Sequence, residues 1–195
     1  LELAEQTGDE THFSRIRRAH DRMDTLIDQV LMLVHEDGEF NTAPYPLADL
    51  ANQAWAHVDT GDATLTVETD DLLICNEDLT LQLFENAFRN SVEHAGQDCH
   101  IELTTVRESD DNGPSTDRIL LSDDGPGIPE DQREVVFDHG MTTTEEGTGL
   151  GLAIIEKIVR SHGWSIRATS GPEGGLGLLI SDAELKTSTD AEAGQ

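Results

Sequence analysis

The stretch Glu146-Gly147-Thr148-Gly149-Leu150-Gly151-Leu152-Ala153-Ile154 places three glycines at alternate positions directly before an apolar helix pattern. The apolar spacing that continues to Ile158 predicts a helix with one buried face. The glycines leave the first amides of this helix uncovered, and exposed N–H groups at the positive end of a helix dipole bind anions. Glycines that only allow close packing of the helix are the alternative explanation.

Two common nucleotide-binding loops do not fit this stretch. A dinucleotide fingerprint needs a buried strand immediately before its first glycine. Here residues 138–146 read DHGMTTTEE, which is a polar loop. A Walker loop needs a lysine and a serine or threonine after the glycines, and this chain has neither there.

A second motif follows an apolar strand. Asp123-Asp124-Gly125-Pro126-Gly127-Ile128-Pro129 comes directly after Ile119-Leu120-Leu121-Ser122, so Asp123 stands at a strand end. A carboxylate there can accept a hydrogen bond from an exocyclic amine, and glycines let a flat ring approach the backbone. An ordinary turn after a strand is the alternative.

A third motif lies on a helix expected at residues 78–95. Asn86, Asn90 and His94 recur every four residues and share one face, with Arg89 beside them. Carboxamide oxygens suit Mg²⁺ together with phosphates, and Arg89 supplies positive charge. A solvated polar face is the alternative, which the poor helix propensity of asparagine disfavours.

The whole pattern predicts an α/β two-layer sandwich with a mixed, largely antiparallel sheet packed on helices. Strands are expected at residues 63–68, 72–75, 100–107, 118–122, 164–170 and 176–181, and helices at 46–58, 78–95 and 150–162. The later strands pair through hairpins, which argues against a doubly wound parallel sheet. Residues 10–36 predict a long N-terminal helix whose apolar seam is typical of a helical hairpin or coiled coil.

The order of these motifs resembles the ATP-binding catalytic domain of sensor histidine kinases, which belongs to the GHKL (Bergerat) superfamily. The resemblance covers roughly residues 41–182 and includes a fourth, looser motif, the glycine-containing terminal hairpin at residues 174–177. Four ordered motifs are more specific than any one of them. Residues 1–38 look like part of the dimerisation and phosphotransfer hairpin with its first helix missing. Residues 183–195 are small and polar, and we expect a disordered tail there.

The resemblance implies a role for each motif residue. Asn90, with Asn86, would coordinate Mg²⁺, and Arg89 would lie near the phosphates as part of the catalytic set. Asp123 would bind the adenine amine, and Phe137 would anchor a lid. The remaining nucleotide contacts would come from His94, Gly125, Gly127, Ile128, Thr142, Gly147, Thr148, Gly149, Leu150 and Gly151.

Three departures from the family pattern stand out. Glu93 and Thr144 occupy positions where relatives often carry a lysine, so two potential cations are missing. The phosphoacceptor histidine of the family lies on the first hairpin helix. Here His20 precedes an aspartate, but it falls on what looks like the second helix, and we interpret it as part of the helix seam.

The resemblance implies a two-component histidine kinase core. It would transfer the ATP γ-phosphoryl group to a histidine of the missing helix, for relay to an aspartate of a response-regulator receiver domain. The parent would be a homodimer, and this fragment would be unable to phosphorylate itself. The interpretation as a GHKL ATPase of the gyrase or MutL type has less support, because Asn86 replaces the general-base glutamate of those enzymes. A nucleotide-sensing or protein-interaction module without phosphotransfer is the remaining alternative.

Composition limits the partners. The chain of 195 residues has a formal net charge of −28, which repels nucleic acid and anionic membrane surfaces. We interpret this charge as a solvated surface suited to the salty cytoplasm of a halophile. No apolar run reaches membrane-spanning length, although the parent could be membrane-associated. Cys75 and Cys99 fit no metal spacing and suggest a reducing interior.

Overall fold

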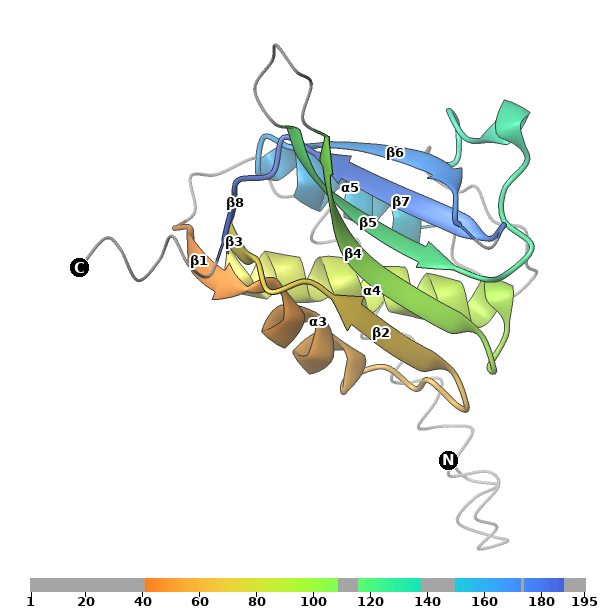
Figure 1. Cartoon of the computed structure of the whole chain (residues 1–195). Helices are drawn as coiled ribbons and strands as arrows, with labels where there is room; N and C mark the ends of the chain where they lie inside the picture. Colours follow the sequence, from red (N-terminus) through yellow and green to blue (C-terminus); the bar gives the residue numbers. More distant parts are fainter. Residues whose placement is uncertain (1–40, 109–115, 138–149, 173, 188–195) are drawn as a thin grey trace, which may run out of the picture. The chain divides into compact units, whose positions relative to one another are not determined.

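The computed structural model describes residues 41–108, 116–137, 150–172 and 174–187, and these form a helical layer packed on a sheet (Figure 1). The main sheet has five strands in the order β2-β4-β5-β7-β6, and a smaller sheet has the order β1-β3-β8. The strands are β1 (Ala43–Pro46), β2 (Thr64–Glu68), β3 (Leu72–Cys75), β4 (His100–Glu108), β5 (Thr116–Asp123), β6 (Ser165–Ser170), β7 (Leu176–Ser181) and β8 (Leu185–Lys186). The helices are α3 (Leu47–Trp55), α4 (Glu77–Ala95) and α5 (Gly151–Ser161), with a 3₁₀ turn, η1 (Glu130–Gln132).

The main sheet is mixed, as the hairpin pattern predicted. Only β2 and β4 pair in parallel, whereas β4–β5, β5–β7 and β7–β6 are antiparallel. In β5 the side chains of Ile119 and Leu121 are buried, and their partners across the ladder are Ile180 and Leu178 of β7, which are buried too. The register therefore directs one apolar face of the sheet toward the helices. The predicted two-layer sandwich is confirmed.

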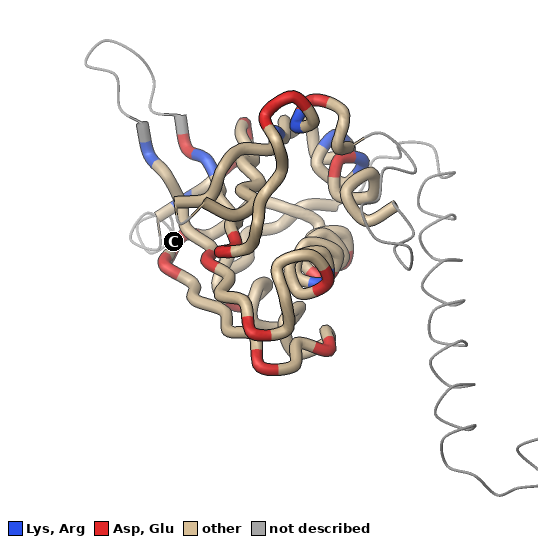
Figure 2. Tube along the Cα trace, turned by 90° about the vertical axis from the view of Figure 1, so that its right-hand side faces the viewer, with Lys and Arg blue, Asp and Glu red and all other residues tan. Residues whose placement is uncertain are grey.

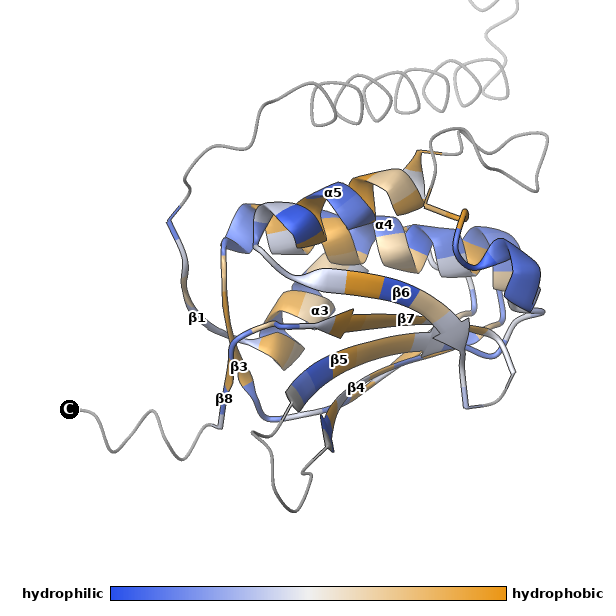
Figure 3. Ribbon diagram, turned by 90° about the horizontal axis from the view of Figure 1, so that it is seen from above, coloured by the Kyte–Doolittle hydropathy of each residue, from blue (hydrophilic) through white to orange (hydrophobic). Residues whose placement is uncertain are grey.

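The three helices cover that face, with α4 between α3 and α5 (Figure 3). Trp55 of α3 meets Phe88 of α4 edge to face at 5.2 Å between ring centroids, and Phe84 stacks on Phe88 at 5.9 Å. Such aromatic pairs add to the stability that burial of the rings already provides. Helix α4, which carries the asparagine motif, is therefore held against α3 by aromatic contacts.

Two predicted boundaries are wrong. Helix α3 ends at Trp55, so Val58 lies beyond the helix on whose buried face we expected it. The polar tail does not begin at residue 183, because Ala183 is buried and β8 pairs with β3. A strand of two residues has no periodicity, and its partner is more than a hundred residues away in sequence. The same small sheet contains β1, whose Pro44 and Pro46 are tolerated because the strand lies at a sheet edge.

The predicted N-terminal helix and hairpin, residues 1–38, fall outside the described residues, as does the tail from residue 188. Within the described ranges, no helix is both long and apolar enough to span a membrane. Figure 2 shows Asp and Glu distributed around the domain, where they outnumber Lys and Arg. The acidic charge is thus spread over the described surface.

His162 joins the C-terminal end of α5 to the start of α4. Its Nε2 accepts a hydrogen bond from the backbone N–H of Asn76 at 3.1 Å, and its Nδ1 lies 2.9 Å from the carbonyl of Ile158. The ring also stacks on Trp164 at 4.2 Å. With Nε2 accepting, the neutral Nδ1–H tautomer donates to Ile158.

Burial lowers the pKa of His162 below its ordinary value of 6.5, while the hydrogen bond to Ile158 acts in the opposite direction. The folded state therefore binds fewer protons than the unfolded state below that value, and stability should fall as the pH decreases through this range. We expect the wild type to lose more stability than His162→Gln between about pH 7.5 and about pH 5.5. Urea denaturation at constant salt measures this, and parallel pH profiles would contradict the expectation.

Candidate functional site

Helix α4 begins with a side-chain cap. The Oδ1 of Asn76 accepts a hydrogen bond from the N–H of Leu79 at 3.0 Å, and Glu77 and Asp78 occupy the first turn, where negative charge favours a helix. The helix then runs without interruption to Ala95. The strong cap fixes the start of the helix one residue before the predicted position.

Asp123 ends β5 as a buried carboxylate, only 7% exposed. Its Oδ1 accepts hydrogen bonds from the backbone N–H groups of Gly125 at 3.1 Å and Leu176 at 3.0 Å. Its Oδ2 accepts a hydrogen bond from the hydroxyl of Ser91 at 3.0 Å. Hydrogen bonds to a carboxylate are stronger than neutral ones and offset the cost of burying it. The three donors come from the loop after β5, from β7 and from α4.

Glycines allow the chain to close around this carboxylate. A Cβ added at Gly175 would collide with the backbone oxygen of Asp123, and one added at Gly125 would collide with Ala95 at the end of α4. Gly127 has φ +68°, a conformation that favours glycine, and a Cβ there would lie 2.8 Å from the oxygen of Gly174. The loop after β5 therefore packs directly on the turn between β6 and β7.

The asparagine stripe meets the start of α5. Asn86 is 5% exposed, and its Nδ2 donates to the carbonyl of Gln82 at 2.7 Å. A Cβ added at Gly151 would lie 2.7 Å from the Oδ1 of Asn90, so the Asn90 side chain packs closely against the start of α5. The Nδ2 of Asn90 is buried without a hydrogen-bond partner among the described residues. A buried N–H without a partner destabilises the folded state unless a ligand or a water molecule accepts its hydrogen bond.

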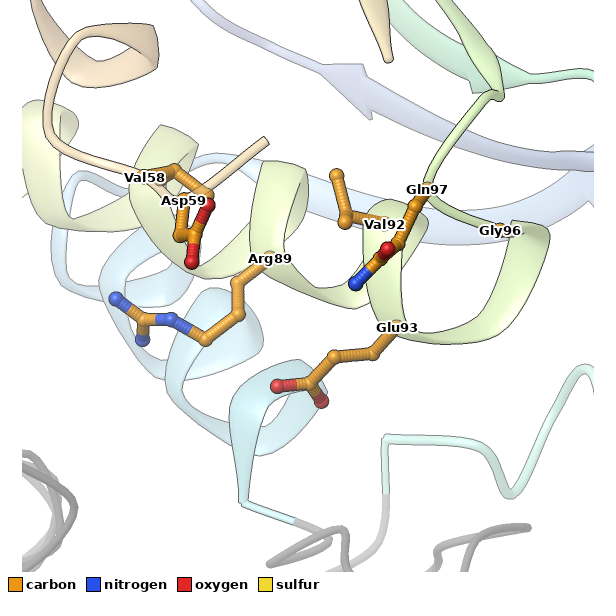
Figure 4. Close-up of a pocket in the computed structure, with 7 residues that line it drawn as sticks. All are labelled: Val58, Asp59, Arg89, Val92, Glu93, Gly96 and Gln97. Carbon is orange, nitrogen blue, oxygen red and sulfur yellow. The ribbon is translucent and has the colours of Figure 1, made fainter. Parts of the chain in front are cut away.

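Arg89 lies on another side of α4. With Val58, Asp59, Val92, Glu93, Gly96 and Gln97 it lines a groove of about 460 Å³ between α4 and the chain after α3 (Figure 4). Two carboxylates, from Asp59 and Glu93, share this groove with the guanidinium. The predicted neighbours Arg89 and Asn90 therefore face different surroundings, and the phosphate contact of Arg89 stays a prediction.

The other predicted residues lie in different surroundings. Ile128 belongs to the loop after β5, where its carbonyl accepts a hydrogen bond from Arg133 at 3.0 Å, and Phe137 is buried, 7% exposed. His94 is exposed in the last turn of α4, so its predicted packing near adenine stays untested. Leu150 is the residue before α5 and is half-buried. The predicted contacts Thr142, Gly147, Thr148 and Gly149 lie outside the described residues.

Sequence reasoning missed three parts of the site. Ser91 is a polar residue seven positions after Phe84 on the buried side of α4, and that break in an apolar face was the available signal. The backbone donor from Leu176 had no such signal, because any residue there has an N–H group. Arg133 was also missed, although it links the Ile128 carbonyl to the hydroxyl of Ser170 at 2.7 Å.

The sandwich, the asparagine helix beside α5 and the buried aspartate at the end of β5 define a Bergerat-type ATP-binding domain. A family model described as histidine kinase-, DNA gyrase B- and HSP90-like ATPase matches residues 75–185, more than half of the chain. The chain belongs to this family, and the relatives that it resembles include sensor histidine kinases.

Among the relatives, the sensor histidine kinase CpxA of Escherichia coli is 28% identical over 196 residues, covering 91% of this chain and 41% of that protein. The sensor-type histidine kinase PrrB of Mycobacterium leprae is 35% identical over 99 residues, covering 49% of this chain and 21% of that protein. The crystal structure of full-length ShkA in complex with AMPPNP matches with a TM-score of 0.71 at 22% identity, over 93% of this chain and 40% of that one. The chain therefore spans less than half the length of these proteins.

The close contact at Gly175 generates a stability prediction. Gly175→Ala should destabilise the domain by roughly 1–3 kcal/mol, because the added methyl group collides with the backbone of Asp123. Gly174→Ala is the matched control, since φ is +104° there but nothing lies within 4 Å of the added Cβ. Urea denaturation of both variants separates the collision from backbone strain. A Gly175→Ala variant as stable as the wild type would contradict the proposed collision.

Proposed function

We propose that this domain binds ATP with Mg²⁺ and acts as the catalytic core of a two-component histidine kinase. The observation that carries the proposal is the carboxylate of Asp123, buried at the end of β5 and held by three donors. Its Oδ2 accepts one of these hydrogen bonds and retains acceptor capacity for an exocyclic amine. Adenine carries such an amine, and the neighbouring glycines leave the backbone accessible to a flat ring.

The phosphates and Mg²⁺ would lie where Asn90 meets the start of α5. The Nδ2 of Asn90 is buried without a partner among the described residues and lies beside the start of α5, which fits a polar ligand at this point. Asn86 and Asn90 would supply amide oxygens to the ion, which prefers oxygen ligands and usually keeps several waters. The first amides of α5, at Leu150 and Gly151, would add the positive end of a helix dipole.

The proposed reaction moves the γ-phosphoryl group of ATP to an imidazole nitrogen of a histidine. Most of the catalysis would be positioning and charge stabilisation, because phosphoryl transfer needs little covalent help from the protein. Mg²⁺ would neutralise charge on the phosphates. We further propose that the acceptor histidine belongs to a hairpin helix of a homodimeric parent, and that a receiver-domain aspartate takes the phosphoryl group next.

Titration calorimetry in molar KCl tests the nucleotide site. Asp123→Asn is the sharpest variant, because its carbonyl can still accept from Gly125 and Leu176 while its NH₂ replaces Oδ2. A donor then faces the amine, and ATP affinity should fall at least about tenfold. Asp123→Ala provides the comparison that removes the acceptor altogether.

The wild type should bind ATP more tightly with Mg²⁺ than without it. A well-folded wild type that binds no ATP would contradict the proposal and favour an interaction module without phosphotransfer. Wild-type affinity in Asp123→Asn would show that this carboxylate is not the adenine acceptor.

Glu93 provides a second test, because it lies one helical turn beyond Asn90 and shares the groove with Arg89. Glu93→Lys should tighten ATP binding about fivefold, since it removes a negative charge and adds a positive one near the proposed phosphates. Glu85→Lys makes the same change of charge on α4 but outside the groove, and should leave affinity nearly unchanged in high salt. Equal effects of the two variants, measured by calorimetry, would contradict a local role.

A further inference from the structure

Ser91 is a buried hydroxyl on the helix that carries the asparagine motif. It is 7% exposed and follows Asn90 directly, among buried neighbours that are mostly apolar. Its Oγ donates to the Oδ2 of Asp123 at 3.0 Å, thirty-two residues along the chain. Within the described residues, no other side chain donates a hydrogen bond to this carboxylate.

We propose that Ser91 is a specificity-determining residue that makes the site select a purine with a 6-amino group over one with a 6-oxo group. It would act through Asp123 as a positioning residue and would not itself touch the amine. This inference rests on the proposed binding of ATP at Asp123.

The argument starts from the distribution of donors on the carboxylate. Two backbone N–H groups, from Gly125 and Leu176, occupy Oδ1. Each carboxylate oxygen has about two acceptor positions, so Oδ1 is saturated and only Oδ2 can receive another donor. Ser91 occupies one position of Oδ2 and leaves one. The carboxylate can therefore accept a single additional N–H. The hydrogen bond from Ser91 fixes the rotation of the carboxylate group, and with it the direction of the remaining acceptor position on Oδ2.

Selectivity follows from what the remaining position can accept. A 6-amino group donates to Oδ2, whereas a 6-oxo group would place a second acceptor against it. A hydrogen-bonding site discriminates strongly against an analogue that leaves the buried polar groups of the site unpaired. This discrimination is larger than that of an apolar pocket against a ligand of slightly different size. Without the hydroxyl of Ser91, Oδ2 could accept a water or turn away, and the preference for the amine would weaken.

A purely structural role predicts a different result. If Ser91 only satisfied the buried carboxylate, its loss would destabilise the domain and weaken every purine nucleotide to the same extent. The ratio of affinities for ATP and inosine triphosphate therefore separates the two roles, because the inosine nucleotide carries a 6-oxo group in place of the amine. Purine riboside triphosphate, which has only hydrogen at this position, adds a third ligand.

The experiment is titration calorimetry on the full chain with Mg²⁺ in molar KCl. Ser91→Ala should lower ATP affinity about tenfold while leaving affinity for the two other nucleotides nearly unchanged, so the selectivity ratio falls about tenfold. Ser91→Thr keeps the hydroxyl and should restore the ratio. Thr80→Val is the matched control, since Thr80 is another buried hydroxyl of α4 that donates to the Asn76 carbonyl at 2.8 Å.

Each outcome decides the matter. A parallel loss for all three nucleotides, or an unchanged ratio in Ser91→Ala, overturns the inference while the nucleotide site stands. A wild type that binds ATP and inosine triphosphate with equal affinity also overturns the inference while the nucleotide site stands. No nucleotide binding by the wild type overturns the proposed function and this inference together. If Ser91→Ala does not fold, Ser91→Cys replaces it, because its thiol is a weaker donor of similar size. Its ratio of ATP to inosine triphosphate affinity should lie between that of the wild type and that expected for Ser91→Ala.

Discussion

The burial of the Asp123 carboxylate is the interaction on which the rest of the domain depends. A carboxylate that is only 7% exposed is tolerable only with hydrogen-bond donors around it, and here they come from three separate elements. Satisfying it therefore brings the end of β5, the C-terminal part of α4 and the start of β7 together. The glycines at positions 125 and 175 follow from this requirement, because a side chain at either would collide with its surroundings.

Helix α4 is held from both ends, and this places its polar residues. At its start, Asn76 caps the helix with its side chain and donates its backbone N–H to His162 of the α5 end. Near its last turns, Ser91 reaches Asp123 and Asn90 contacts Gly151. The helix therefore cannot slide or rotate without breaking contacts at several points. Rigid support of this kind is what a site needs if it is to position phosphates for transfer.

Charge sets a second constraint on the proposed function. The chain carries a formal net charge of −28, yet ATP is itself an anion. In the groove beside α4 the guanidinium of Arg89 is accompanied by Asp59 and Glu93. Attraction of the phosphates would then depend on Mg²⁺ and on the N-terminal amides of α5, and less on side-chain cations. High salt would screen the repulsion between the protein and the nucleotide.

The sequence by itself determined the order of the three helices and of six of the eight described strands, the mixed sheet and the strand-end position of Asp123, because apolar periodicity and glycine motifs are local properties. Only the tertiary structure decided which groups meet that carboxylate. Ser91 and the N–H of Leu176 approach it from 32 and 53 residues away, and no local pattern encodes such contacts. Strand β8 escaped prediction for the same reason, since its hydrogen bonds to β3 join distant segments and its two residues carry no period.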